Sequence, residues 1–528
     1  AASRPLLRSF SASPWRRKLL TGGAIVVGTG SAIELYRSID CAEDFRQVGL
    51  IRFGRAACTV SRIVVDYKYS LYGLPYPSEE YLAALKKCHL RCADRLLELA
   101  AANGGVFVKV GQHAAALEYL LPKEYTTTLA VLMNQAPEST LDDVRTVVEE
   151  DLGCKLEEVF SEFADKPVGA ASLAQVHVAR LRETGEKVAV KVQHRRVKKN
   201  ARTDINTMQF MVNITDMVFP DFQLQWLVDE VKKNLPVELD FLQEAANANK
   251  MRNAFAHLPF LKIPTMMIPL SSSRVLTMEF CEGEHINKVE YLKEKGIDTG
   301  DVCRKMGRLI SEMIFERGYL HSDPHPGNVL VNKKANGQVE IVLLDHGLYL
   351  TMEDSFRKLY SRLWLALLKP DQDEIKRVAD EMGVGELYGL FACIVTRRSW
   401  KSVTSGIGKS NMDEKEKKEL RAYAVTLIPQ ISQVLQRMPR EMVLILKTND
   451  LLRAIEHKLG AAGGGYIEMS KCVVSSWHHL AIKSAKTWRE SLCLRLSLIY
   501  AMSRLIAYDY FLRFNSCLPR AIQLNTIV

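Results

Sequence analysis

The sequence of 528 residues lacks the features that mark several common classes of protein. Its eleven cysteines show no metal-binding spacing, and scattered reduced thiols are the simplest interpretation. Cys88 and Cys92, four residues apart on an expected helix, could instead form a disulfide or half of a metal site. The net charge of +10 comes without a nucleic-acid-recognition module, because the basic residues are spread along the chain. Anionic partners such as a nucleotide or an acidic lipid fit this charge, and no nucleic acid is expected.

The first 33 residues have no acidic side chain at all. Arginines, one lysine and several serines dominate them, which is typical of a mitochondrial targeting segment. The uncharged run at 19–33 would span roughly 22 Å as a helix, less than the ~30 Å hydrocarbon core of a bilayer. It fits a membrane anchor extended by its flanking residues, and it also fits a targeting segment that is cleaved or attached to a surface.

Two motifs in the second half of the chain predict phosphoryl transfer. Asp323 and Asn328 lie in one short segment at 321–328, and Asp345 follows an apolar run. Phosphoryl transfer needs a carboxylate beside the attacking oxygen and metal ions on the phosphates. We therefore predict that Asp323 accepts or orients the proton of the nucleophile. Asn328 and Asp345 are the predicted ligands of Mg²⁺, which prefers a few hard oxygen ligands.

An upstream segment supplies the other half of such a site. Residues 188–191 resemble a strand that ends in Lys191, the lysine that reaches the α- and β-phosphates in kinases. Residues 168–176 stand where a kinase has its glycine-rich loop, but they are rich in alanine. A left-handed backbone costs alanine roughly 1–2 kcal/mol, so this loop cannot copy the glycine-loop geometry. The residues of this loop that we expect to bind nucleotide are Gly169, Ala170, Ala171, Ser172, Leu173, Ala174 and Val176.

Together these segments resemble the UbiB/AarF-domain atypical kinases. The resemblance covers most of 40–460, and 446–453 is similar to the mitochondrial members. It implies an α+β, bilobal protein-kinase-like fold with an N-terminal helical extension carrying a KxGQ motif, inserted N-lobe helices and a helical C-terminal tail. The matching segments, in the order of the family, are 109–112 (KxGQ), 169–176, 188–191, 238–240 (ExD), Glu244, 321–328 and 345–347.

The resemblance also implies specific pairs of side chains. Lys109 of the KxGQ motif would pair with Glu238, Gln112 would face the nucleotide site, and Lys191 would pair with Glu244. In the family the KxGQ helix crosses the cleft where a protein kinase admits its peptide, which implies a site closed to protein substrates. Without the resemblance, Lys109 and Gln112 would be interpreted as a solvated pair.

The other acidic residues of this region are open to the same two interpretations. Without the family, Glu238, Asp240 and Glu244 would be interpreted as a solvated charged face of a helix. With it, Asp240 belongs to the ExD motif and has a regulatory role. Residues 274–283 then resemble a strand that runs into a hinge, where the backbone around Glu279 would hold adenine.

Three features depart from a signalling protein kinase. Ser322 replaces the arginine that would pair with a phosphorylated activation loop, and no A-P-E sequence follows Gly347. His346 replaces the phenylalanine of D-F-G. Regulation by loop phosphorylation is therefore not expected.

The chain divides into five predicted parts. The C-lobe should be helical apart from a short strand pair that flanks Asp345. In the tail, residues 491–514 are apolar but carry four charges, each costing about 2.5–3.5 kcal/mol at a bilayer centre. A helix that lies on a membrane, or one packed on the C-lobe, fits better than a spanning helix. The parts are 1–33 (targeting or anchor), 34–150 (extension), 151–283 (N-lobe), 284–460 (C-lobe) and 461–528 (basic tail).

These observations predict an atypical kinase that binds ATP (or ADP) and Mg²⁺ and acts as an ATPase or as a kinase of small molecules or lipids. The resemblance implies a mitochondrial protein at the inner membrane that supports lipid and coenzyme Q homeostasis and cristae organisation. A membrane lipid or a quinone-pathway client, and inner-membrane proteins, are the implied partners. Two alternatives stay open: a nucleotide-switched pseudokinase scaffold and a true protein kinase.

Overall fold

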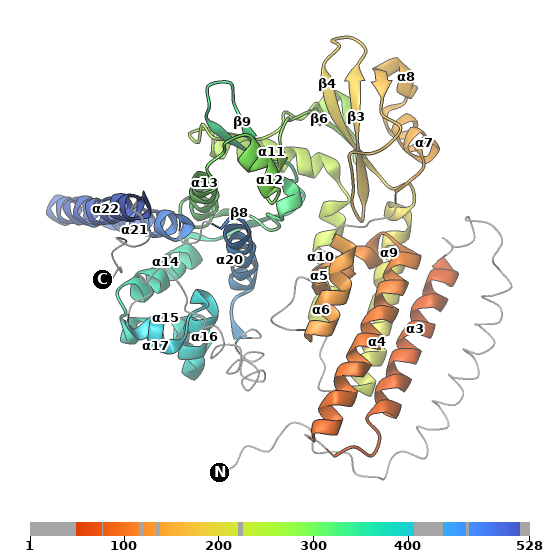
Figure 1. Ribbon diagram of the computed structural model, residues 1–528, viewed down its shortest axis with the longest axis horizontal. Helices are drawn as coiled ribbons and strands as arrows, with labels where there is room; N and C mark the ends of the chain where they lie inside the picture. The colour runs from red at the N-terminus through yellow and green to blue at the C-terminus, as the bar shows by residue number, and fades with distance from the viewer. Residues whose placement is uncertain are drawn as a thin grey trace. The chain divides into compact units, whose positions relative to one another are not determined.

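The computed structural model describes residues 49–75, 78–115, 121–133, 138–219, 225–405, 434, 437–460 and 464–517 (Figure 1). The predicted targeting run at 19–33 and most of the glycine-rich hinge at 461–465 lie outside the described residues. The chain forms two compact units. Unit 1 comprises Ala1–Ala245 and Met266–Phe280, and unit 2 comprises Ala246–Thr265 and Cys281–Val528.

Unit 1 contains a five-stranded antiparallel sheet. Its strand order is β1 (Phe160–Phe163), β3 (Ala174–Leu181), β4 (Lys187–Gln193) and β6 (Val275–Glu279), and β2 (Gly169–Ala170) pairs with β3. The β3–β4 hairpin turns at Gly185, which has a φ of +70° that glycine adopts without strain.

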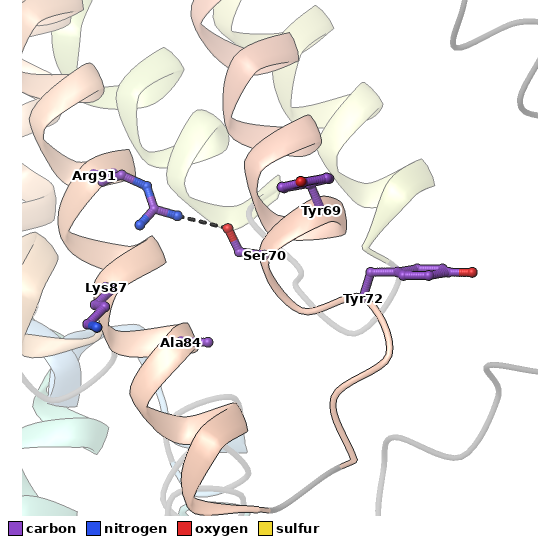
Figure 2. Close-up of a pocket in the computed structure, with 6 residues that line it drawn as sticks. All are labelled: Tyr69, Ser70, Tyr72, Ala84, Lys87 and Arg91. Carbon is purple, nitrogen blue, oxygen red and sulfur yellow. Dashed lines mark hydrogen bonds between the residues drawn. The ribbon is translucent and has the colours of Figure 1, made fainter.

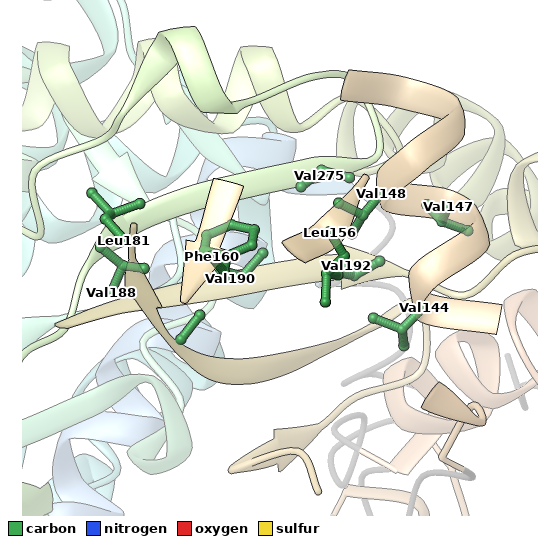
Figure 3. Close-up of a cluster of buried hydrophobic side chains, with 11 residues drawn as sticks. Val144, Val147, Val148, Leu156, Phe160, Leu181, Val188, Val190, Val192 and Val275 are labelled. Atoms are coloured by element: carbon green, nitrogen blue, oxygen red, sulfur yellow. The ribbon is translucent and has the colours of Figure 1, made fainter. Parts of the chain in front are cut away.

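One apolar face of this sheet is covered by helices α7 (Leu141–Leu152) and α8 (Leu156–Val159). Val188, Val190 and Val192 alternate along β4, so their side chains all point to the same face. Figure 3 shows them with side chains from α7 and from β1, all of them buried. This core fixes β4, and therefore the strand that carries Lys191.

In the helical part of unit 1, helix α4 begins directly after Ser78. The Ser78 hydroxyl accepts a hydrogen bond from the Tyr81 amide at 3.1 Å, which caps the first turn. A buried ion pair then joins two helices, because the Arg52 Nε donates to Asp204 Oδ1 at 2.8 Å. The helices are α3 (Gly49–Ser70), α4 (Glu79–Asn103), α5 (Val106–Ala115), α6 (Lys123–Leu129), η1 (Ala130–Met133), α9 (Val197–Val218), α10 (Gln225–Glu238), α11 (Phe241–Ala254, which continues into unit 2) and η2 (Ile268–Leu270).

Unit 2 has more strands than the sequence predicted. A four-stranded sheet has the order β5 (Leu261–Lys262), β10 (Val339–Leu343), β9 (Val329–Lys333) and β7 (Glu284–His285). The strands on either side of Asp345 do not pair with each other, because β10 pairs with β9 while β11 (Tyr349–Thr351) pairs with β8. The prediction of a single strand pair was therefore wrong. Strand β8 is Tyr319–His321.

The rest of the described part of unit 2 is mostly helical. Helix α13 has a strongly amphipathic pattern, with Val302, Met306 and Ile310 buried on one face. The helices are α12 (Val289–Glu294), α13 (Thr299–Ser311), η3 (Glu312–Arg317), η4 (Pro326–Asn328), α14 (Asp354–Leu368), α15 (Gln372–Glu381), η5 (Gly385–Leu387), α16 (Tyr388–Thr396), α17 (Trp400–Ser405), α20 (Arg440–Leu459), α21 (Gly464–Ser484) and α22 (Trp488–Cys517).

Helix α22 packs along α21 through polar contacts. Lys471 of α21 bonds to the buried Asp509 of α22 at 2.7 Å, and His478 Nε2 lies 3.2 Å from Ser497 Oγ. Within the described residues, the stretch Trp488–Tyr510 is the one helix whose length and apolar composition suffice to cross a membrane. The two predicted alternatives to a spanning helix, one that lies on a membrane and one packed on the C-lobe, remain predictions.

Candidate functional site

The lysine on β4 and the glutamate on α11 form the predicted ion pair in unit 1. Lys191 Nζ lies 2.7 Å from Glu244 Oε1 and 2.9 Å from Oε2. The Glu244 side chain is only 3% exposed, so its charge has little access to water. A buried carboxylate without a cation is strongly unfavourable, which means that each member of the pair fixes the other.

The ExD motif organises the start of the helix that carries Glu244. The Asp240 carboxylate accepts a hydrogen bond from the Leu242 amide at 3.1 Å, and the Asp240 carbonyl accepts from the Glu244 amide at 3.3 Å. Asp240 therefore caps α11 and sets the position of Glu244 one turn later. Glu238, at the end of α10, pairs with Lys109 at 2.6 Å, which is the other ion pair that the resemblance implies.

Gly111 and Gln112, the last two residues of the KxGQ motif, both lie against Leu132 of η1. A Cβ on Gly111 would lie 2.4 Å from Leu132 Cδ1, so the glycine allows α5 to approach η1 closely. Gln112 Nε2 donates to the Leu132 carbonyl at 2.8 Å, a contact that the sequence did not predict. The predicted place of Gln112 at a nucleotide remains a prediction, and its amide nitrogen is already bonded.

The alanine-rich loop is a tight turn between β2 and β3. The Ala171 amide donates to the Ala174 carbonyl at 2.8 Å, and no residue from 169 to 176, all of them described, has a positive φ. The loop therefore avoids the left-handed conformations that would penalise alanine. Ser172, Leu173 and Ala174 are buried, and Leu173 packs in a core with residues of α9 and α10. Their predicted nucleotide contacts remain predictions.

His194 and Gln175, which were not predicted from the sequence, hold this loop in place through hydrogen bonds. His194 donates from Nε2 to the Ala171 carbonyl at 2.9 Å, while its Nδ1 accepts from the Ser139 hydroxyl at 2.7 Å. Burial lowers the pKa of His194, so the neutral ring makes both bonds. The buried Gln175 amide bonds Ser139 through both its oxygen, at 2.7 Å, and its nitrogen, at 3.1 Å. A single polar side chain that points into the protein, from a strand or directly after one, leaves no periodic pattern in the sequence. It therefore could not be predicted from the sequence.

In unit 2, His321 links the predicted base to the predicted metal residue. Its Nδ1 accepts a hydrogen bond from the Asp323 amide at 3.0 Å, which leaves Nε2 protonated to donate to the Asp345 carbonyl at 2.5 Å. Burial lowers the pKa of His321, against the smaller opposite effects of the Asp345 and Asp323 charges. The ring is therefore neutral, as both bonds require, and it holds two loops at a fixed separation.

The two predicted metal ligands also lie in unit 2. Asn328 Nδ2 donates to the Asp323 carbonyl at 3.3 Å, so the amide oxygen is the atom suited to a cation. Asp345 Oδ1 accepts from the Gly347 amide at 2.8 Å, which orients the carboxylate. An amide oxygen and a carboxylate are hard donors, and Mg²⁺ usually takes one or two such protein ligands beside water and phosphate. The residues present fit this ion.

His346 is buried and hydrogen-bonded, although it replaces an apolar residue of protein kinases. Its Nε2 donates to the Leu343 carbonyl at 3.0 Å, and its Nδ1 accepts from the Tyr349 hydroxyl at 2.8 Å. Asn247 of α11 donates to the His346 carbonyl at 3.0 Å. Polar contacts thus fix the segment after Asp345 in the place where apolar packing is usual.

A lysine from a distant helix contacts the predicted base. Lys447 of α20 lies 3.0 Å from Asp323 Oδ1. The sequence predicts no role for Lys447, because 446–453 carries only a resemblance to the mitochondrial members of the family. A contact between residues so far apart in the chain leaves no local pattern, so only the structure could show it.

A shallow hollow in the helical part of unit 1 is lined by none of the predicted site residues. It has a volume of about 500 Å³ between α3 and α4 (Figure 2). Tyr69 and Tyr72 are exposed at its rim, and Arg91 donates to the Ser70 hydroxyl at 2.8 Å.

Close to this hollow, Asp66, Cys88 and Cys92 form a compact cluster. Hydrogen bonds from Arg91, Ser70 and Arg95 hold the pKa of Asp66 well below its ordinary value, against the effect of burial. Burial raises the pKa of the Cys88 thiol to about 12, and the two sulfur atoms are 3.9 Å apart without a bond. Both cysteines are free thiols. Because Arg91 and Arg95 already pair with the Asp66 carboxylate, the cluster is a poor metal site.

The lysine–glutamate pair beside an antiparallel sheet, the segment that carries the predicted base and the predicted metal ligands belong to an α+β protein-kinase-like protein, with helices before the sheet and a helical C-terminal part. Residues 131–379 match the ABC1 atypical kinase-like domain. The chain is 49% identical over 434 residues to AarF domain-containing protein kinase 1 of Gallus gallus, covering 82% of this chain and 83% of that protein. It is 45% identical over 465 residues to AarF domain-containing kinase 1 of Drosophila melanogaster, covering 87% and 89%.

The chain therefore belongs to the ABC1/AarF domain-containing atypical kinase family, as the sequence motifs predicted. Among solved structures, the Rv3197–erythromycin complex from Mycobacterium tuberculosis is 23% identical, with a TM-score of 0.43 over 72% of this chain and 94% of that chain.

Proposed function

We propose that this protein binds Mg·ATP or Mg·ADP and acts as an ATPase or as a kinase of small molecules or lipids. The observation that carries the proposal is the network around His321, which fixes the backbone of Asp323 to the carbonyl of Asp345. A protein that only needed stability would gain little from holding a half-exposed carboxylate beside a metal-binding one. Phosphoryl transfer depends on such positioning more than on covalent chemistry.

Each predicted residue has a defined task in this proposal. Asp323 binds the attacking hydroxyl or water and takes its proton, and Asn328 and Asp345 hold the Mg²⁺ that neutralises phosphate charge. Lys191, fixed by Glu244, binds the α- and β-phosphates. The backbone at the end of β6, next to Glu279, would hold adenine.

A peptide acceptor fits less well than a small one. Ser322 is buried and stands where a protein kinase has the arginine that pairs with a phosphorylated loop. Lys109 of the KxGQ motif is committed to Glu238, as in a family whose KxGQ helix occupies the peptide site. We therefore propose a small-molecule or lipid acceptor, or water.

A membrane partner, at the mitochondrial inner membrane, is part of the same proposal. Helix α22 packs one face on α21 and exposes an apolar stripe along the opposite face, formed by Trp488, Leu492, Leu496 and Ile499. Nearby arginines would bind anionic lipid headgroups, and the exposed apolar side chains would enter the bilayer interface. The stripe supports the proposed membrane partner, whereas the proposed link to mitochondrial lipid and coenzyme Q homeostasis and to cristae organisation rests on the family resemblance.

The lipid arm of the proposal predicts vesicle binding that depends on the stripe. The full chain should co-sediment with vesicles that contain cardiolipin, and Leu496→Asp should weaken this binding. Ser497→Asp, which adds the same charge next to the α21 contact instead, controls for charge alone. Equal binding by wild type and Leu496→Asp would contradict a membrane role for α22.

The enzymatic arm is tested by phosphate release from Mg·ATP. Wild type should turn over, and Asp345→Asn should lose at least about 100-fold of the rate because Mg²⁺ loses its charged ligand. Nucleotide binding measured in parallel separates the alternatives. Binding without turnover under any condition would favour the nucleotide-switched scaffold, and turnover retained by Asp345→Asn would contradict the proposed metal role.

A further inference from the structure

The segment 320–328 of unit 2 carries the predicted base Asp323, and we call it the base loop. A lysine from a distant part of the chain contacts this loop. Residues 320–328 contain no lysine or arginine, although the loop carries the predicted base and a metal ligand. Lys447 of α20 supplies the charge, with its Nζ 3.0 Å from Asp323 Oδ1. Helix α20 begins more than one hundred residues after this loop, so only the fold brings the two together.

Helix α20 holds Lys447 in place through the residues around it. Thr448 and Leu446 are buried, and Asn449 Nδ2 donates to the Tyr360 hydroxyl of α14 at 3.4 Å. Asp450 accepts from Arg397 Nε, at the end of α16, at 3.1 Å. Because the backbone on both sides of Lys447 is anchored, its ammonium group does not have the freedom of an ordinary surface lysine.

Stability alone gives a weak reason for this ion pair. The Asp323 side chain is 41% exposed and that of Lys447 is 23% exposed. Ion pairs with this much access to water contribute about 0–1 kcal/mol. An anchored lysine aimed at the base is therefore better explained by the chemistry of the loop than by the free energy of folding.

That chemistry gives a cation at this position a role beside those of Mg²⁺ and Lys191. In phosphoryl transfer, negative charge spreads over the three oxygens of the moving group, and Asp323 adds a further negative charge beside them. A nucleophile bound to Asp323 lies about 2.6–3.2 Å from the carboxylate. The Lys447 ammonium, at 3.0 Å from the same carboxylate, is then within reach of the phosphoryl oxygens.

We propose that Lys447 is a catalytic residue that binds the phosphoryl group during its transfer at Asp323. This inference rests on the function proposed above. A bond forms between the acceptor oxygen and the γ-phosphorus, and the bond from that phosphorus to the bridging oxygen breaks, with its electron pair leaving on ADP. The acceptor proton passes to Asp323. Lys447 exchanges no proton in this step, and its positive charge offsets the charge of the phosphoryl oxygens.

The transition state can be examined without measuring turnover, by using aluminium fluoride as a mimic of the phosphoryl group in flight. The affinity of full-length protein for Mg·ADP is measured by calorimetry, with and without aluminium fluoride. Lys447→Met removes the charge and keeps the length of the side chain, whereas Lys447→Arg keeps the charge. Lys458→Met, at an exposed position of the same helix, is the matched control.

In wild type, aluminium fluoride should tighten Mg·ADP binding. Lys447→Met should lose roughly 100-fold of that gain, with the affinity for Mg·ADP alone almost unchanged. Lys447→Arg should recover most of the gain, and Lys458→Met should behave as wild type. A merely structural lysine would change both affinities together or neither.

The outcomes separate this inference from the function on which it rests. If wild type binds Mg·ADP but Lys447→Met keeps the full aluminium fluoride gain, the role of Lys447 is contradicted and nucleotide binding stands. The same conclusion follows if wild type binds Mg·ADP with no gain at all. If wild type binds no nucleotide, the proposed function itself is contradicted, and the inference falls with it.

Discussion

Each unit of the molecule has a lysine paired with a carboxylate, but the two pairs differ in their access to water. In unit 1, Glu244 is 3% exposed and binds Lys191 through both oxygens. In unit 2, Asp323 is 41% exposed and binds Lys447 through one oxygen. The buried glutamate can serve only to position its lysine. The exposed aspartate can still receive a substrate, so its lysine affects charge more than architecture.

The largest expected effect comes from removing the buried carboxylate. Glu244→Ala leaves Lys191 without its partner in a poorly hydrated place, and we expect a loss of about 3–5 kcal/mol in the free energy of unfolding. A urea titration of the full chain measures it. Glu162→Ala removes the partner of Arg180 in an exposed pair of the same sheet and should cost less than about 1 kcal/mol.

Equal losses for these two variants would contradict the contrast between buried and exposed pairs. A large loss for Asp323→Ala would also contradict it, because the exposed pair of unit 2 should behave like the Glu162 control.

The second effect concerns the close approach of α5 and η1. Gly111→Ala places a methyl group against Leu132, and such overpacking costs about 1–3 kcal/mol. Gly54→Ala, inside α3 with no atom within 4 Å of the new Cβ, should instead stabilise by about 0.5–1 kcal/mol. Thermal unfolding of both variants gives the comparison. The same sign for both would show that the glycine of the KxGQ motif does not act through packing.

The smallest expected effect is that of metal on the Asp66 cluster. Because arginines neutralise Asp66 and the thiols stay protonated, adding zinc or a chelator should leave the unfolding temperature unchanged. Zinc at a hundred times its dissociation constant would instead stabilise the protein by about 2.7 kcal/mol. A zinc-dependent rise that Cys88→Ser removes would therefore establish a metal site there.

The ion pairs of these lysines also show which contacts could be predicted from the sequence and which could not. The Lys191–Glu244 and Lys109–Glu238 pairs were predicted because they belong to motifs with a fixed order in the family. The contact of Lys447 with Asp323 was not, because nothing in either local sequence points to the other. The motifs thus predicted the chemistry of each unit, but not the helix that completes the base.

Small elements of the fold escaped prediction for a different reason. Strands β5 and β7 have two residues each, too few for the alternating pattern that identifies a strand. Strand β2 (Gly169–Ala170), in the alanine-rich loop, is also only two residues long and was not predicted for the same reason. The loop is held by a hydrogen bond from His194 rather than by glycine conformations. Such features depend on side chains that meet only after folding.

The most direct test of the central claim is a single-turnover measurement on the base. Full-length wild type and Asp323→Asn are mixed in excess over Mg·ATP, and ADP formation is followed over time. The account predicts that both proteins bind Mg·ATP with similar affinity, while Asp323→Asn forms ADP at least about 100-fold more slowly. Equal rates in the two proteins would show that Asp323 is not the base, and would contradict the assignment of phosphoryl transfer to this loop.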